Sequence, residues 1–190
     1  KAFLPHLEAS GEGHVVNLSS VFGLISIPAQ SAYNAAKFGV RGFTDALRME
    51  LEEEGAPISV TLIKPGSIDT PFFEKARTYL GVEPQPVPPV YAPEVAAKAI
   101  LECAEKPTRD VIVGGMGKVI SFAQTVSPRL TDKYMERSTS ESQLTDQTVS
   151  PDRQDNLYAP VAHDGGERGR TWTGRTKSTS LYTHAALHPR

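Results

Sequence analysis

The sequence predicts an α/β protein built on a parallel sheet, and three observations lead to this prediction. Short runs rich in valine and isoleucine alternate with helical patterns over residues 1–127. Glycine or proline follows the second and third runs, where a strand would end. The helical stretches between the runs are long enough for right-handed crossovers, which join strands that lie parallel.

Each predicted element has a local signal. The strands are expected at residues 14–19, 58–63 and 110–113, and the first of them is expected to be buried. The helices are expected at residues 1–9, 31–54, 73–80 and 93–105. We expect Ser31 to cap the long helix, Gly55 to stop it and Pro93 to open the next helix. The glycine-rich residues 114–118 (GGMGK) are expected to form a turn.

Composition excludes several classes of protein. With 190 residues, 39% hydrophobic and 22% charged, the chain is unlike a collagen-like, coiled-coil or wholly disordered protein. A net charge of −2 offers no basic surface for nucleic acid or anionic lipid. The longest uncharged run, residues 13–36, contains Asn, Gln and Pro, so we expect no membrane contact. Cys103 is the single cysteine, which excludes an internal disulfide and indicates a reducing, cytoplasmic compartment.

Residues 128–190 differ in composition from residues 1–127. From about Arg137 onward they are rich in Ser, Thr, Asp, Gly and Arg and hold few large apolar side chains. Ordering each residue costs roughly 1–2 kcal/mol, which so little apolar surface cannot offset. We therefore expect one domain over residues 1–127, followed by a polar, disordered tail. In that tail His184 and His188 are expected to be solvated, and no metal site is expected.

An apolar pattern spans residues 119–126 and 130–135 and is broken at Pro128. A surface anchor, a subunit contact and a helix that closes a pocket all fit this pattern. Packing is favoured, because the pattern is too short to span a bilayer and only modestly basic.

Tyr33 and Lys37 lie four residues apart on the long predicted helix, so their side chains share one face. Acid–base work by a tyrosine at neutral pH needs its pKa lowered by about three units, or roughly 4 kcal/mol. One cation about 4 Å away at an effective dielectric near 20 supplies energy of that order. The pair is chemically sufficient, but by itself it also fits a Tyr and a Lys on an ordinary exposed helix.

Two further segments lie where strands end. Ser19 and Ser20 close the first strand, and Ser20 precedes Tyr33 by thirteen residues, across a loop that can return it to the helix start. Residues 65–70 (PGSIDT) follow the second strand. Open parallel sheets place their ligands at this end of the strands. Each segment alone also fits an ordinary turn.

These residues together resemble the short-chain dehydrogenase/reductase family, over about residues 1–115. The resemblance implies a partial Rossmann-like, doubly wound parallel sheet, made of the last three strands with their helices. In that family the tyrosine is the general acid/base, which assigns this role to Tyr33. Lys37 would hold the nicotinamide ribose and lower the pKa of Tyr33, and Ser20 would orient the substrate carbonyl or hydroxyl. The remaining cofactor contacts would come from the PGSIDT segment: Pro65, Gly66, Ile68 and Thr70.

The resemblance also implies a cofactor, a substrate and a missing half. The cofactor would be NAD or NADP, the substrate a small alcohol or carbonyl compound, and residues 71–89 a mobile lid over it. Phe72, Phe73, Tyr79 and Leu80 would contact the substrate, or equally pack a short helix. The glycine-rich turn that holds a dinucleotide is absent after the first strand, so the chain is expected to be the carboxyl half of such an enzyme.

The long helix also suggests a partner. A stripe of Ala36, Val40, Phe43, Leu47 and Leu51 would pack on the sheet. A second apolar stripe would need another cover, either a second copy of the chain in a homo-oligomer or the missing half. Two functions remain as alternatives to the dehydrogenase: a non-catalytic scaffold that kept the fold, and an epimerase or dehydratase of the extended branch.

Overall fold

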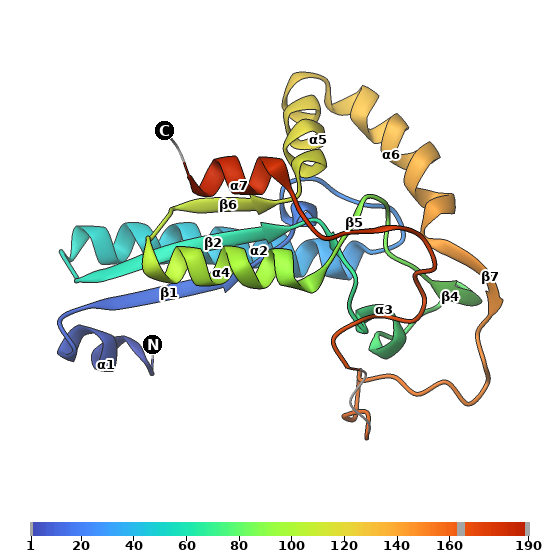
Figure 1. Cartoon of the computed structure of the whole chain (residues 1–190), viewed down its shortest axis with the longest axis horizontal. Coiled ribbons are helices and arrows are strands. Elements are labelled where there is room, and N and C mark those ends of the chain that lie inside the picture. Colours follow the sequence, from blue (N-terminus) through green and yellow to red (C-terminus); the bar gives the residue numbers. More distant parts are fainter. Residues whose placement is uncertain (1, 163–165, 189–190) are drawn as a thin grey trace.

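The centre of the fold is a three-stranded parallel sheet, in a computed structural model that describes residues 2–162 and 166–188 (Figure 1). Its strands are β1 (Gly13–Leu18), β2 (Ile58–Pro65) and β6 (Asp110–Val113), in the order β1-β2-β6. β1 runs parallel to β2, with Gly13 opposite Ile58 and Leu18 opposite Ile63. The predicted α/β class and parallel sheet are therefore confirmed.

Two long crossover helices cover opposite faces of this sheet. α2 (Ser31–Glu53) packs Leu51 against Ile58 and Val60 of β2, which point to one face. α4 (Pro93–Glu105) packs Ala99 and Cys103 against β2 and β6 on the other face. Pro93 opens α4 as predicted, and Gly55, with φ +66°, follows the end of α2. The sheet thus has a helix layer on each side, as parallel sheets usually do.

Several local predictions are wrong in detail. β1 is half-buried rather than buried, because it is an edge strand with one neighbour among the described residues. The helix expected at residues 73–80 is a single turn, α3 (Phe72–Lys75). Gln30, not Ser31, precedes the first turn of α2, and it provides no side-chain cap. α1 (Leu4–Ala9) is the helix expected at the start of the chain.

The glycine-rich residues 114–118 open a helix instead of forming a turn. α5 (Gly115–Val126) begins there, immediately after β6. Gly114 has φ +101°, and an added Cβ would lie 2.7 Å from the Tyr91 ring. A glycine is therefore needed at this position for both its backbone conformation and its close contact.

The segment expected to be a disordered tail instead contains defined elements. They are α6 (Pro128–Ser142), β7 (Leu144–Thr148), β8 (Thr176–Lys177) and α7 (Leu181–Leu187). β7 pairs with β4 (Val82–Pro84), and β8 joins a small parallel sheet with β5 (Val90–Tyr91) and β3 (Ser67–Ile68). Figure 1 shows α7 lying along β6. The segment attaches through backbone pairing and ion pairs, which a count of its apolar residues does not reveal.

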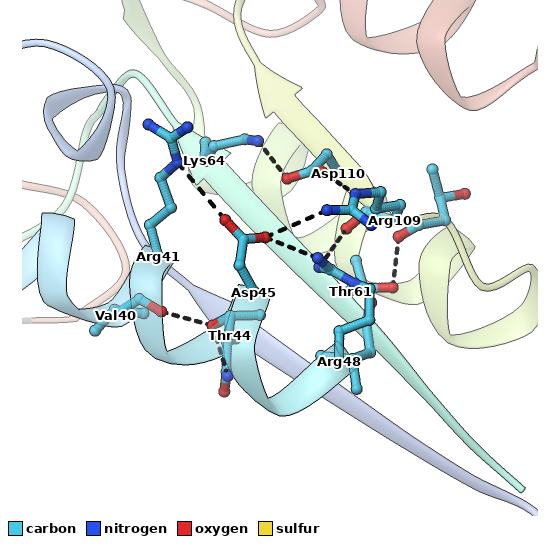
Figure 2. A network of polar contacts seen from close by, with 12 residues as sticks. Val40, Arg41, Thr44, Asp45, Arg48, Thr61, Lys64, Arg109 and Asp110 are labelled. Atoms are coloured by element: carbon cyan, nitrogen blue, oxygen red, sulfur yellow. Dashed lines mark hydrogen bonds and ion pairs between the residues drawn. The ribbon is translucent and has the colours of Figure 1, made fainter. Parts of the chain in front are cut away.

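The face of α2 that meets the sheet is more polar than predicted. Its buried residues are Asn34, Thr44, Arg48 and Leu51, whereas Phe43 of the predicted stripe is 63% exposed. Arg48 donates from Nε to the Val60 carbonyl at 3.1 Å and from Nη2 to the Arg109 carbonyl at 3.2 Å. Figure 2 shows this guanidinium reaching from α2 across β2, with Asp45 beside it. The contacts fix α2, which carries Tyr33 and Lys37, to the sheet.

We expect Asp45→Asn to lower the free energy of unfolding by about 1–3 kcal/mol. Three guanidinium groups surround this carboxylate, those of Arg41, Arg48 and Arg109 (Figure 2). The Arg48 side chain is only 5% exposed, so the variant leaves a buried cation without its counter-charge. The carboxylate itself is 34% exposed, and solvent screening keeps the loss below that of a fully buried pair. Urea unfolding of both chains measures the difference.

Asp146→Asn is the matched control for this variant. It removes the same charge from an exposed side chain that forms no ion pair within the described residues. Equal losses of stability in the two variants would contradict the role given to Asp45.

Candidate active site

The residues proposed from the sequence gather at the carboxyl ends of β1 and β2. Ser20 follows β1 and precedes the short 3-10 helix η1 (Val21–Gly23), while Tyr33 lies in the first turn of α2. A cavity of about 180 Å³ lies between these elements and α3. Its walls include six of the proposed residues: Ser20, Tyr33, Pro65, Gly66, Ile68 and Thr70. Lys37 is not among the lining residues, but it lies one helical turn after Tyr33 and its ammonium is 5.6 Å from the centroid of the Tyr33 ring.

The two serines at the end of β1 have different surroundings. Ser19 Oγ donates to the Lys37 carbonyl at 2.7 Å, and a Cβ on Gly23 would lie 2.4 Å from this oxygen. The Ser20 hydroxyl accepts from the Phe22 amide at 3.1 Å and donates weakly to the Pro65 carbonyl at 3.3 Å. Ser20 also interacts with the Tyr33 side chain. This arrangement favours Ser20 over Ser19 as the residue that meets a ligand.

Tyr33 lies in a partly buried, aromatic environment. Its ring centroid is 5.7 Å from that of Phe72, which belongs to the lid. Burial raises the pKa of the Tyr33 phenol above its ordinary value, and this effect outweighs the hydrogen bond to Ser20, which lowers the pKa. The phenol is therefore protonated at neutral pH.

Lys37 does not bring the pKa of Tyr33 below its ordinary value in this structure, contrary to the sequence expectation. Its ammonium donates to the Leu18 carbonyl at 3.2 Å and lies over the Tyr33 ring, 5.6 Å from the ring centroid. Burial lowers the pKa of Lys37 itself. The strand-end carbonyl holds the ammonium over the ring, so desolvation decides the direction in which the pKa of Tyr33 moves.

The segment after β2 is hydrogen-bonded to β6 and to β5, and it leaves the Thr70 hydroxyl available for a ligand. The Gly66 amide donates to the Val113 carbonyl of β6 at 2.9 Å. Ile68 pairs with Tyr91 of β5, and the Thr70 amide donates to the Ile68 carbonyl at 3.0 Å. The Thr70 hydroxyl has no hydrogen-bond partner among the described residues and lies in the cavity wall. It is suitably placed to bind a polar group of a ligand.

Asp69 is a supporting residue that the sequence analysis missed. It is buried, and it accepts from the Gly169 amide at 3.2 Å and from the Thr176 hydroxyl at 3.1 Å. Arg168 lies 3.8 Å from the same carboxylate and pairs with Glu94 at 2.7 Å. No local pattern reveals this role, because the partners of Asp69 lie about a hundred residues further along the chain.

Arg153 holds the proposed lid, residues 71–89, through an ion pair and two hydrogen bonds to backbone carbonyls. The Arg153 side chain is 10% exposed and forms an ion pair with Glu83 at 3.0 Å. It also donates to the carbonyls of Ala76, at 2.8 Å, and Phe73. Phe73 lines the cavity, so Arg153 acts on the site through the lid backbone.

We expect Arg153→Met to loosen the lid without unfolding the domain. Charge-assisted hydrogen bonds contribute about 1.5–3 kcal/mol, so local opening becomes roughly 10- to 100-fold more frequent. Hydrogen exchange of the amides in residues 72–84 measures this opening. Arg175→Met, at an exposed position that forms no ion pair in the part of the chain that the structure describes, is the control. Unchanged lid exchange in the Arg153→Met variant would show that the arginine does not hold this segment.

The sheet, its two helix layers and a Ser–Tyr–Lys group at the strand ends define an α/β protein of the Rossmann-like type. The family profile described as "short chain dehydrogenase" matches residues 1–80. A similar protein is "Uncharacterized oxidoreductase YxnA" of Bacillus subtilis, 40% identical over 193 aligned residues, which cover 100% of this chain and 53% of that protein. Residues 1–80 of the chain therefore match the short-chain dehydrogenase/reductase family, the family that the Ser–Tyr–Lys group suggested.

Two further similarities agree with this family. "Putative oxidoreductase SadH" of Mycobacterium tuberculosis is 46% identical over 127 residues, 63% of this chain and 46% of that protein. A crystal structure of a short chain dehydrogenase from Burkholderia cenocepacia in complex with NADP has the same fold. Its TM-score is 0.57 at 24% identity, over 70% of this chain and 51% of that one. This chain spans about half the length of these relatives.

Two observations on the described residues concern membranes and metal ions. None of the helices in residues 2–162 and 166–188 is both long and apolar enough to pass through a bilayer. The rings of His184 and His188 lie 4.5 Å apart, and His188 is 3.8 Å from Glu102. The same ranges contain no group of three or more His, Cys, Asp or Glu side chains that could hold a metal ion.

Proposed function

We propose that the protein is an NAD(P)-dependent oxidoreductase that interconverts an alcohol and a ketone or aldehyde, with Tyr33 as the general acid/base. The observation that carries this proposal is one cavity lined by Ser20, Tyr33 and Thr70, with the Lys37 ammonium beside the tyrosine. The names of the relatives as oxidoreductases and the NADP complex of the Burkholderia protein support the reaction class and the cofactor.

The residues of this cavity fit the nicotinamide end of such a cofactor. The Thr70 hydroxyl finds no partner within the described residues, and the Lys37 ammonium uses one donor on the Leu18 carbonyl, which leaves donors for ribose hydroxyls. Pro65, Gly66 and Ile68 would supply backbone contacts to the carboxamide. The sequence offers no glycine-rich turn after its first strand to hold the pyrophosphate. When bound, the cofactor supplies or accepts the hydride.

The protonation state of Tyr33 matches a role as proton donor in carbonyl reduction. Ser20 orients the carbonyl oxygen toward the phenol, and Tyr33 transfers its proton to that oxygen as the carbonyl carbon becomes an alcohol carbon. In the reverse direction the phenolate accepts the alcohol proton, and Lys37 stabilises that phenolate. Because its pKa is raised, Tyr33 is in the protonated form that carbonyl reduction requires near neutral pH.

The test uses the full natural protein. It is incubated with NADH or NADPH and a panel of aldehydes and ketones, and oxidation of the nicotinamide is followed by absorbance. We expect carbonyl-dependent oxidation of one of the two cofactors, and a loss of about 10²-fold or more in Ser20→Ala. Binding of neither cofactor, or oxidation independent of Ser20, would contradict the proposal.

A further inference from the structure

We propose that a second cavity, beside the active site, binds an apolar part of the substrate, so that the protein acts on alcohols or carbonyl compounds with a hydrocarbon portion of about ten carbon atoms. This inference rests on the proposed function and specifies its substrate class. The second cavity lies between η1, the lid, α5 and α6 and has a volume of about 280 Å³.

The two cavities share a wall. Phe22, Gly66, Ser67 and Val87 line both of them, so a molecule whose reactive carbon lies near Tyr33 can extend past these residues into the second cavity. Ser20, which precedes Phe22 by two residues, lies on the side of the first cavity only. The shared wall makes the second cavity an extension of the candidate active site.

The lining of the second cavity is apolar. Val21, Ile25, Ile120 and Met135 form much of its wall, and none of its lining residues is charged. Three of its hydroxyl groups, those of Ser138, Thr139 and Ser142 in α6, are already bonded within the helix, whereas those of Ser67, Tyr91 and Tyr134 form no hydrogen bond within the described residues. Ser138 donates to the Tyr134 carbonyl at 2.7 Å and Ser142 to the Thr139 carbonyl at 3.3 Å. Thr139 donates to the Met135 carbonyl.

This bonding pattern selects the chemistry of the occupant. A charged or strongly polar group in the cavity would lose its water and find few free partners on a wall that is mostly apolar, which costs free energy. A hydrocarbon group loses nothing of this kind and gains from the removal of apolar surface from water. The cavity is therefore suited to an alkyl chain or a hydrocarbon ring system.

The volume sets the size of that group. A cavity of about 150 Å³ in another protein holds one benzene molecule. By proportion, 280 Å³ has room for about ten carbon atoms, either a chain or two fused rings.

Gly117 fixes the wall that α5 contributes. A Cβ at this position would lie 2.3 Å from the Val21 side chain and 3.3 Å from that of Ile112. The glycine therefore allows α5 to approach η1, whose N-cap is Ser20. The glycine-rich residues after β6, which were expected to form a turn, thus allow α5 to pack against η1 next to Ser20.

The test compares aldehydes of increasing chain length, from propanal to decanal, with the full-length natural protein. We expect KM to fall about three- to fourfold for each added methylene until the cavity is full. Ser138→Phe fills the cavity from α6 and should remove this gain for long aldehydes while kcat/KM for propanal stays within about twofold. Val126→Phe, on the exposed outer side of α5, is the control and should behave as the parent protein.

A binding measurement separates this inference from the proposed function. Titration calorimetry should detect binding of decanol to the parent but not to Ser138→Phe. Such binding without turnover of any carbonyl would refute the proposed function alone. Turnover with a KM independent of chain length would overturn the cavity assignment. If thermal unfolding shows that Ser138→Phe does not fold, Ile120→Phe replaces it, because this variant fills the same cavity from α5. The same results are expected of it, and the same results would overturn the assignment.

Discussion

Tyr33→Phe is expected to lower kcat by about 10²–10⁴-fold while cofactor affinity stays nearly unchanged. The substitution removes the only proton that the phenol carries and keeps the ring, including its contact with Phe72 at 5.7 Å. Because the carbonyl oxygen then keeps only the orienting Ser20 hydroxyl and has lost its general acid, its proton must come from water. Steady-state rates of carbonyl reduction and a cofactor titration of both proteins measure the two effects separately.

The control for this variant is Tyr158→Phe, which removes the same hydroxyl from a side chain that is largely exposed and does not line the cavity. Its rate should equal that of the parent protein. If Tyr33→Phe reduced carbonyl compounds within a few-fold of the parent rate, Tyr33 would not be the proton donor.

Lys37→Met is expected to weaken both the chemical step and cofactor binding. The ammonium lies 5.6 Å from the ring centroid and favours the phenolate, and because solvent screens this partly exposed lysine we expect a loss of about 10-fold in the rate of alcohol oxidation. The direction in which the pH profile of alcohol oxidation shifts follows from the pKa of Tyr33. Alcohol oxidation needs the phenolate, whose pKa is raised by burial and would rise further without the ammonium. The limb on which oxidation increases with pH should therefore move to higher pH.

Two comparisons make this second prediction specific. Lys118→Met removes an exposed lysine of α5 and should leave the pH profile in place. Lys37→Arg keeps a cation on the same turn and should restore part of the phenolate stabilisation. An unchanged pH profile in Lys37→Met, together with normal cofactor affinity, would leave Lys37 a surface lysine of α2.

The sequence alone was sufficient for the order of the main elements. Valine- and isoleucine-rich runs marked β1, β2 and β6, and Pro93 and Gly55 marked the ends of helices at positions that the structure confirms. Signals of this kind depend on a few neighbouring residues, so they survive without knowledge of the rest of the fold. The same patterns were misleading where long-range contacts dominate. Phe43 fitted an apolar stripe but is exposed, since Arg48 and Thr44 occupy the inner face of α2.

What the sequence determined by itself about this protein is the neighbourhood of Ser20, Tyr33 and Lys37, because one strand end, one loop and one helical turn join them. Only the tertiary structure decided what supports that neighbourhood. Arg153 meets Glu83 across 70 residues and Thr176 meets Asp69 across 107, contacts that no local pattern encodes. The tertiary structure also decided the direction in which the pKa of Tyr33 moves, because burial is a property of the packed chain and outweighs the hydrogen bond to Ser20.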